Sequence, residues 1–273
     1  MQNQNQSQAD VSRLPHNRWQ VFADRIQTHF GKFVLLGLLL LLFALPLFAV
    51  RFVADLLISS VQESFNSAQI TEQQFVDTVK TVQLFSSLAG VVGYVIFGIG
   101  VMGVIRHVRK MAWSEPTSFW HDFAVGIKQN LGGLWCFLAI GVLNAFSSVC
   151  MQNYSGAVAY LPFCLQVLVL FPIILHIIVQ LSIYNHKIWD LITTSSFIYV
   201  KTAPLSIVFS ILFNGYGLLD LVPSFALKYV LKFVFVLIIP IIMLGWFLYC
   251  CSALDKYVNR QSYPQIVDKG IWR

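Results

Sequence analysis

The amino-acid sequence predicts an all-α fold: a polytopic membrane helical bundle with six transmembrane helices and amphipathic interfacial helices. The 273 residues are 57% hydrophobic and only 11% charged, with a mean hydropathy of +0.71, whereas a soluble domain usually carries about a quarter charged residues. Residues 33–50 form the run FVLLGLLLLLFALPLFAV, which holds no charged side chain. At about 1.5 Å per residue, a helix of this length crosses most of a hydrocarbon core of about 30 Å. Both observations place most of the chain in lipid.

Five further apolar runs predict the other spans. The expected spans are 33–50, 84–105, 131–151, 157–183, 203–223 and 229–254. They belong to one membrane domain over 13–254, which lies between a disordered polar tail at 1–12 and a basic cytoplasmic tail at 255–273. The first span follows a basic segment, exceeds the usual signal-peptide core of about 7–15 residues and lacks a small-x-small cleavage site. We therefore expect it to remain in the mature protein.

Three amphipathic stretches lead into outward spans, and each contains a tryptophan. In the first, Asn17 is the expected N-cap of a helix over 18–30, with Trp19 on its apolar face. Trp120 and Trp189 lie in the second and third stretches. Basic amphipathic helices with aromatic anchors lie in the membrane interface. The three units predict a threefold internal repeat, although any six-span chain with interfacial linkers looks threefold, and both interpretations stay open.

Lysine and arginine are distributed unevenly between the two sides of the predicted domain. Of 18 such residues, only Arg51, Lys80, Lys228 and Lys232 fall on the side opposite the N terminus. The positive-inside rule therefore predicts cytoplasmic termini for a protein of the cell membrane. The net charge of +6 is spread around the apolar runs and forms no single block, so we expect the lipid bilayer as a partner and no nucleic acid.

Catalytic motifs are absent from the sequence. It contains no HExxH, no GxSxG, no P-loop and no dinucleotide-binding fingerprint after a strand. The five cysteines and six histidines lack the spacing of zinc ligands. We therefore expect no catalytic residues, no cofactor and no metal site, and predict that the protein is not an enzyme.

Polar side chains at membrane depth are the first candidates for function, because their burial in lipid is costly. Asn144, His176, Gln180 and Asn214 qualify, and His176 and Gln180 lie one turn apart on the fourth span. Pro172, one turn before His176, frees a backbone carbonyl. Together the four are candidates to line a substrate cavity beside a broken helix. For each residue singly, a hydrogen bond between neighbouring helices is the simpler interpretation.

Two groups of charged residues flank the spans. Asp220 and Lys232, near the outer ends of the fifth and sixth spans, predict either a local ion pair or a gate at an outward mouth. Arg106, Arg109 and Lys110 follow the second span. They either set the topology, or hold anionic lipid headgroups or a phosphorylated ligand.

The segment FWHDFAVGIKQN at 119–130, which leads directly into a span, resembles the YesL-like family of bacterial integral membrane proteins. Leu45-Pro46 and the six-span layout are also similar, whereas the segment 51–80 is long for the family and the third amphipathic stretch matches only loosely. The resemblance implies occurrence beside carbohydrate-uptake systems and no established activity or catalytic residue. The predicted interfacial anchors, four of which match the family motif, are Trp19, Phe119, Trp120, Phe123, Asn130 and Trp189.

Three functions fit these patterns. The chain is expected to be a small-molecule transporter or an accessory to a transport system, with components of a transport complex as partners. The alternative is a non-catalytic membrane scaffold or assembly partner that acts through its interfacial helices and its second span, which is rich in glycine. A membrane enzyme acting on lipid-linked substrates is the third interpretation. The scarcity of ionisable groups in the spans is evidence against it.

Overall fold

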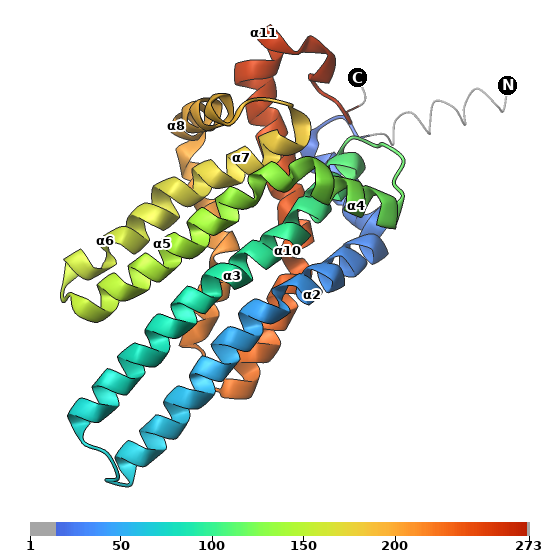
Figure 1. Cartoon of the computed structure of the whole chain (residues 1–273). Coiled ribbons are helices and arrows are strands. Elements are labelled where there is room, and N and C mark those ends of the chain that lie inside the picture. Colours follow the sequence, from blue (N-terminus) through green and yellow to red (C-terminus); the bar gives the residue numbers. More distant parts are fainter. Residues whose placement is uncertain (1–14, 272–273) are drawn as a thin grey trace, which may run out of the picture.

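The computed structural model describes residues 15–271, and every element within them is a helix or a short helical turn (Figure 1). Six helices are long and apolar enough to cross a membrane, which confirms the predicted all-α, multi-pass fold. The expected polar tail at 1–12 lies outside the described residues. The first helices are α2 (Arg18–Asn66), α3 (Glu72–Ala112) and α4 (Phe119–Asn130), the last joined through η1 (Leu131–Gly133) to α5 (Leu134–Asn153).

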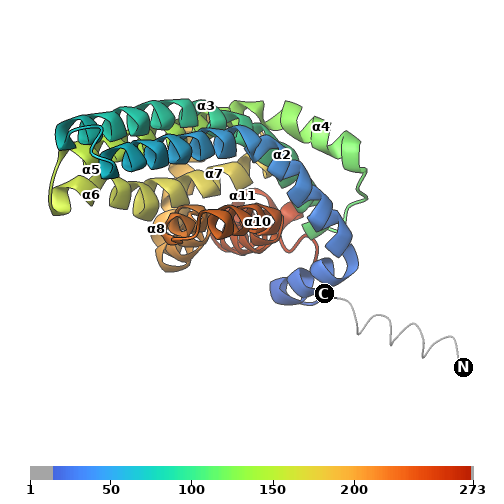
Figure 2. The ribbon, with the colours of Figure 1, turned by 90° about the horizontal axis from the view of Figure 1, so that it is seen from below.

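The second half of the chain has more interruptions. The fourth span consists of α6 (Ala157–Leu165), the π-turn η2 (Gln166–Leu170) and α7 (Phe171–Ile183). Then follow α8 (Ile188–Phe213), α9 (Gly215–Leu218), η3 (Leu219–Leu221) and α10 (Phe225–Leu254). The chain ends in η4 (Asp255–Asn259), α11 (Arg260–Ser262) and η5 (Pro264–Ile266). Seen from below, α8 and α10 lie on one side of the molecule and α3 on the other, with α7 between them (Figure 2).

Helix α3 contacts five other helices: α2, α4, α5, α7 and α10. Its glycines allow this close approach. A Cβ at Gly98 would lie 2.5 Å from the ring of Phe137 on α5, and one at Gly100 would lie 2.9 Å from Phe43 on α2. The glycine-rich second span therefore packs against two different helices through its small residues.

Each of the three amphipathic stretches joins its outward span at a local kink. The backbone leaves helical geometry at His29 (φ −125°, ψ 20°), Asn130 (φ −106°, ψ 9°) and Thr202 (φ −128°, ψ 15°). The Asn17 side chain caps the first stretch by accepting from the Gln20 amide at 2.9 Å, as the sequence predicts. The recurrence of the kink is a structural regularity of the three units, and their descent from one repeat stays a prediction.

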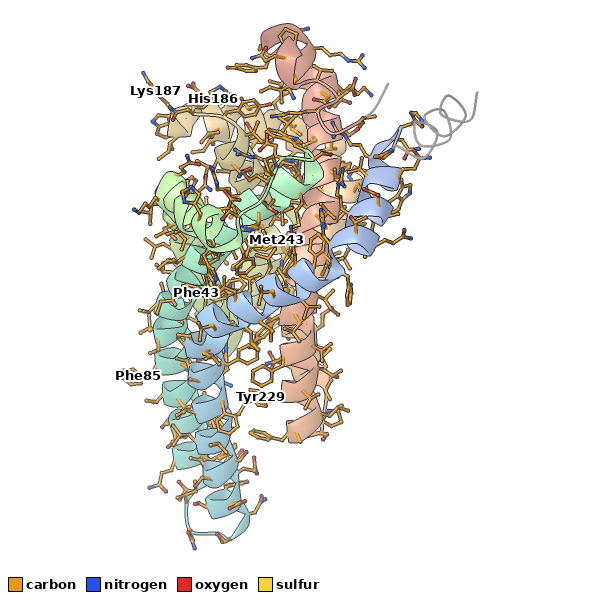
Figure 3. The ribbon with its side chains drawn as sticks, turned by 90° about the vertical axis from the view of Figure 1, so that its right-hand side faces the viewer. Phe43, Phe85, His186, Lys187, Tyr229 and Met243 are labelled. Carbon is orange, nitrogen blue, oxygen red and sulfur yellow. The ribbon has the colours of Figure 1, made fainter. Side chains whose placement is uncertain are left out.

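The helix ends gather on two opposite faces of the bundle. The terminal face holds α4, the starts of α2 and α8 and the end of α10, and the distal face holds the opposite helix ends (Figure 1). His186 and Lys187 lie at the terminal face, and Tyr229 lies at the far end of α10 (Figure 3). The fifth span differs from the expected 203–223, because α8 ends at Phe213 and Asn214 separates it from α9 and η3.

A two-helix arm, residues 53–80, extends the distal face. The Phe52 ring lies 5.4 Å from the ring of Phe225, the first residue of α10, so α2 reaches the start of α10 at this level. The span expected at 33–50 is thus part of a longer helix that runs on to Asn66, about 21 Å beyond Phe52 at 1.5 Å per residue. The arm projects beyond the other helices (Figure 1).

Candidate functional site

His176 and Gln180 lie on the face of α7 that packs against α8 and α10. His176 is 1% exposed, its Nε2 lies 3.1 Å from the Ser206 hydroxyl, and its Nδ1 lies 3.4 Å from the Cys250 sulfur. Its ring centroid lies 4.7 Å from that of Trp246. The imidazole therefore joins three helices, and its two ring nitrogens both have protein neighbours.

Gln180 makes a similar connection one turn further along α7. Its Nε2 donates to the Ser195 hydroxyl of α8 at 2.7 Å, and the side chain is 1% exposed. Its Oε1 has no hydrogen-bond partner among the described residues. Ser195 and Ser206 are fully buried along α8. Short hydroxyl side chains thus face the polar groups of α7, a common arrangement between membrane helices.

Hydroxyl groups of α8 donate hydrogen bonds to backbone carbonyls at the interruption of the fourth span. Pro172 has no N–H for the carbonyl of Leu168, four residues earlier, and the Tyr199 hydroxyl donates to that oxygen at 2.5 Å. The Ser210 hydroxyl donates to the neighbouring carbonyl of Val167 at 2.5 Å. The broken helix therefore presents these two carbonyls to α8.

The structure does not assemble the four predicted cavity residues into one site. Asn214 ends α8 and donates to the Ser210 carbonyl at 2.9 Å, whereas Asn144 is half-buried on α5. Within residues 15–271, no hydrogen bond joins any two of the four. Two surface hollows, of about 310 Å³ between α8 and the end of the chain and about 170 Å³ between α3 and α5, are lined by other residues.

The basic residues at the end of α3 are paired within the protein. The Asp122 carboxylate, whose side chain is fully buried, accepts from Lys110 Nζ at 2.7 Å and lies 3.7 Å from Arg106 Nε. Arg109 lies 3.9 Å from a Glu115 oxygen. Asp122 and Glu115 were not predicted as site residues, although both follow the cationic cluster closely in sequence. The three cations expected to contact lipid headgroups have these protein carboxylates as partners.

The last residues fold back over the terminal face. Arg18 forms an ion pair of 2.8 Å with Asp255, and Lys269 forms one of 2.7 Å with Glu115. Tyr184, between α7 and α8, donates to Asn259, and burial raises the pKa of its phenol. The segment expected as a basic tail, as far as it is described, is docked on the bundle.

The predicted interfacial anchors separate into two groups. Trp19, Trp120 and Trp189 are 75%, 70% and 77% exposed, so they can reach the membrane interface. Phe123 and Asn130 are buried, and Asn130 donates to the Met102 carbonyl of α3 at 3.4 Å. The anchors of the 119–130 motif therefore differ in role: Trp120 faces outward, whereas Phe119, Phe123 and Asn130 attach α4 to the bundle. Phe119 does so through its ring contact with His107.

The candidate gate pair forms at the distal face. Lys232 Nζ lies 2.5 Å from an Asp220 oxygen, and the lysine side chain is fully buried whereas that of the aspartate is 52% exposed. The ammonium group also lies 4.6 Å from the Tyr216 ring centroid and 5.5 Å from that of Tyr229. Aromatic faces attract such a cation, so the lysine is held by rings as well as by a carboxylate.

Further charges surround this pair. Asp55 on α2 pairs with Lys228, and the Tyr229 hydroxyl donates to the same carboxylate at 2.9 Å. Arg51 lies one turn before Asp55, half-buried. We call these residues the distal charge cluster: Arg51, Asp55, Tyr216, Asp220, Lys228, Tyr229 and Lys232. Sequence reasoning identified only the Asp220–Lys232 pair, because the other members come from helices far apart in the chain.

Compared with protein families, curated proteins and solved structures, this chain has no significant match. The resemblance to the YesL-like family therefore rests on the residues of the 119–130 motif, on Leu45-Pro46 and on the span layout.

Proposed function

We propose that this chain is a non-catalytic accessory protein of the cell membrane, which acts as an assembly partner in a small-molecule transport system. The arm carries this proposal. It is a folded projection about 21 Å long that leaves the bundle at the level where α10 begins. An assembly role gives such a projection a purpose that packing within the bundle does not.

The arm is ordered by its own contacts. The Phe65 and Phe75 rings stack at 5.0 Å between its two helices. Thr71 and Gln74 form a capping box, in which each side chain accepts from the backbone N–H of the other. A preorganised surface of this kind loses little conformational freedom when it binds a partner.

The polar groups at membrane depth support the accessory role over a carrier role. His176 and Gln180 bond to serines of the neighbouring helix, as helix-to-helix ties do. The bias of Lys and Arg toward the terminal face supports cytoplasmic termini, with the arm outside the cell. The resemblance to the YesL-like family adds carbohydrate uptake as the system in which we expect the partner.

Site-specific photo-crosslinking in living cells tests the assembly role. A photoreactive amino acid is placed at the exposed arm positions Ser59 and Gln73, and at the exposed position Val92 of α3 as a matched control. We expect one discrete protein adduct from the arm positions, identified by mass spectrometry as a transport component, and lipid adducts from the control. The same adducts from arm and control positions would argue against the proposal.

A transporter is the second candidate, favoured by the two interrupted spans that lie side by side. The π-turn η2 and the break at Asn214 occur in helices that contact each other, and broken helices form the binding sites of many transporters. Proteoliposomes that contain only this chain separate the two functions. Uptake of labelled mono- or oligosaccharides above that of empty liposomes would establish the carrier, whereas an accessory protein shows none.

A further inference from the structure

The distal charge cluster holds one more cation than it has carboxylates. Asp55 pairs with Lys228, and Asp220 pairs with Lys232. The remaining cation, Arg51, has no ion pair within residues 15–271 and is half-buried at the end of the apolar part of α2. Partial burial of a guanidinium is costly without an anion, because the protein interior screens its charge poorly.

The cluster also contains a hydrogen-bond donor without an acceptor. The Tyr216 hydroxyl is buried and has no partner among the described residues. An unpaired buried donor costs about 1–3 kcal/mol. A group that accepts a hydrogen bond would recover this energy.

One carboxylate of the cluster is exposed at the distal face. Asp220 is half-exposed and lies on the short η3 turn, whereas its partner Lys232 is completely buried. Tyr229 lies at the distal end of α10 (Figure 3), and its ring forms a second wall beside the ammonium group. Asp220 is therefore the more exposed member of the Lys232 pair.

We propose that the distal charge cluster binds one singly charged anionic group, a carboxylate or a phosphate, between Arg51, Tyr216 and Lys232. Arg51 supplies the uncompensated charge, and its planar guanidinium matches a two-oxygen anion. Tyr216 donates a hydrogen bond, and Lys232 shares its ammonium between the ligand and Asp220. The site does not depend on the accessory role. Two sources have this chemistry: a soluble organic acid and the headgroup of a phospholipid.

Thermal unfolding of the full-length protein tests the site. The protein is measured in detergent with acetate, glucuronate or inorganic phosphate, each compared with chloride at equal ionic strength, and in nanodiscs of phosphatidylglycerol compared with phosphatidylcholine. We expect a saturable rise of the Tm with at least one of these probes. The Arg51→Gln and Tyr216→Phe variants are expected to need at least tenfold more of that probe for the same rise. Lys80→Gln, a cation of the arm outside the cluster, should respond as the wild type does.

The outcomes separate the sources and decide the proposal. A response to a soluble acid identifies a solute site, and a response to phosphatidylglycerol alone identifies a lipid site. Tyr216→Phe removes only a hydroxyl without a partner, so this variant should fold even where Arg51→Gln does not. Absence of any response in the wild type, or an unchanged response in Tyr216→Phe and Arg51→Gln, would overturn the proposal.

Discussion

The Tyr199 hydroxyl of α8 donates a hydrogen bond of 2.5 Å to the carbonyl oxygen of Leu168, the residue four positions before Pro172. Proline cannot supply the N–H that this carbonyl would have in an unbroken helix. In lipid no water replaces it, so the donor has to come from a neighbouring helix. The bond thus stabilises the interruption of the fourth span and fixes α8 against it.

Replacement of Tyr199 by phenylalanine should therefore destabilise the protein. The change removes the donor and leaves the ring in place, so we expect a loss of about 1 kcal/mol in the free energy of unfolding. Unfolding by denaturing detergent measures it. Tyr160→Phe is the control, since Tyr160 is 57% exposed and makes no hydrogen bond within the described part of the chain. Equal stability of both variants would contradict the role of the Tyr199 bond.

His176 and Ser206 should be energetically coupled, because the imidazole and the hydroxyl bond across α7 and α8. A double-mutant cycle with His176→Leu and Ser206→Ala should give a coupling energy of about 0.6 kcal/mol, the average for such bonds in membranes. Stability in detergent is again the measurement. Strictly additive losses would show that the two side chains act independently and would reopen the cavity interpretation of His176.

Gly37 should tolerate replacement by alanine less well than Gly90. A Cβ there would lie 2.5 Å from the carbonyl oxygen and 2.9 Å from the Cα of Leu237 on α10, which are backbone atoms that cannot rotate away. Gly37→Ala should cost about 1–3 kcal/mol, as overpacking does. Gly90→Ala is the control, because a Cβ at Gly90 meets no atom within 4 Å, and helix propensity alone should make it neutral or stabilising. A similar change in stability for both variants would mean that α2 and α10 are not in close contact.

Loss of the Asp122 carboxylate should destabilise the protein more than loss of an exposed carboxylate. Asp122→Asn leaves Lys110 and Arg106 without their shared buried anion, for which we expect a loss of about 2–3 kcal/mol. Asp24→Asn, which removes a surface pair with Arg25, should cost less than about 1 kcal/mol. The two unfolding curves, measured side by side, provide the comparison. If Asp24→Asn costs as much as Asp122→Asn, burial does not strengthen the Asp122 pairs.

The sequence predicts the spans well because a long apolar run directly indicates a segment that lies in lipid. The six helices and the cap at Asn17 follow from local patterns alone. The sequence does not predict the arm as a continuation of the first span, because charged residues such as Arg51 and Asp55 indicate where lipid ends and not where a helix ends. The sequence does not predict the break at Asn214, because apolar residues lie on both sides of this short interruption in the run 203–223.

The candidate site was harder to predict, because it depends on contacts between distant helices. The four predicted cavity residues are all polar side chains within the spans. The packing of α7 against α8 and α10 decides that two of them, His176 and Gln180, meet serines. Asp55 and Tyr229 are 174 positions apart and come together through a hydrogen bond of 2.9 Å. No spacing in the sequence reports such a pair.

The orientation of the arm relative to the terminal face is the most direct test of this account. Gln69→Cys at the tip of the arm and Lys187→Cys at the terminal face are placed in a chain whose exposed Cys164 is replaced by serine. Sealed, right-side-out vesicles are treated with a membrane-impermeant maleimide before and after permeabilisation. We predict that the arm cysteine is labelled at once and the Lys187→Cys cysteine only after permeabilisation. Labelling of both cysteines in intact vesicles would contradict an outward arm on a bundle with cytoplasmic termini.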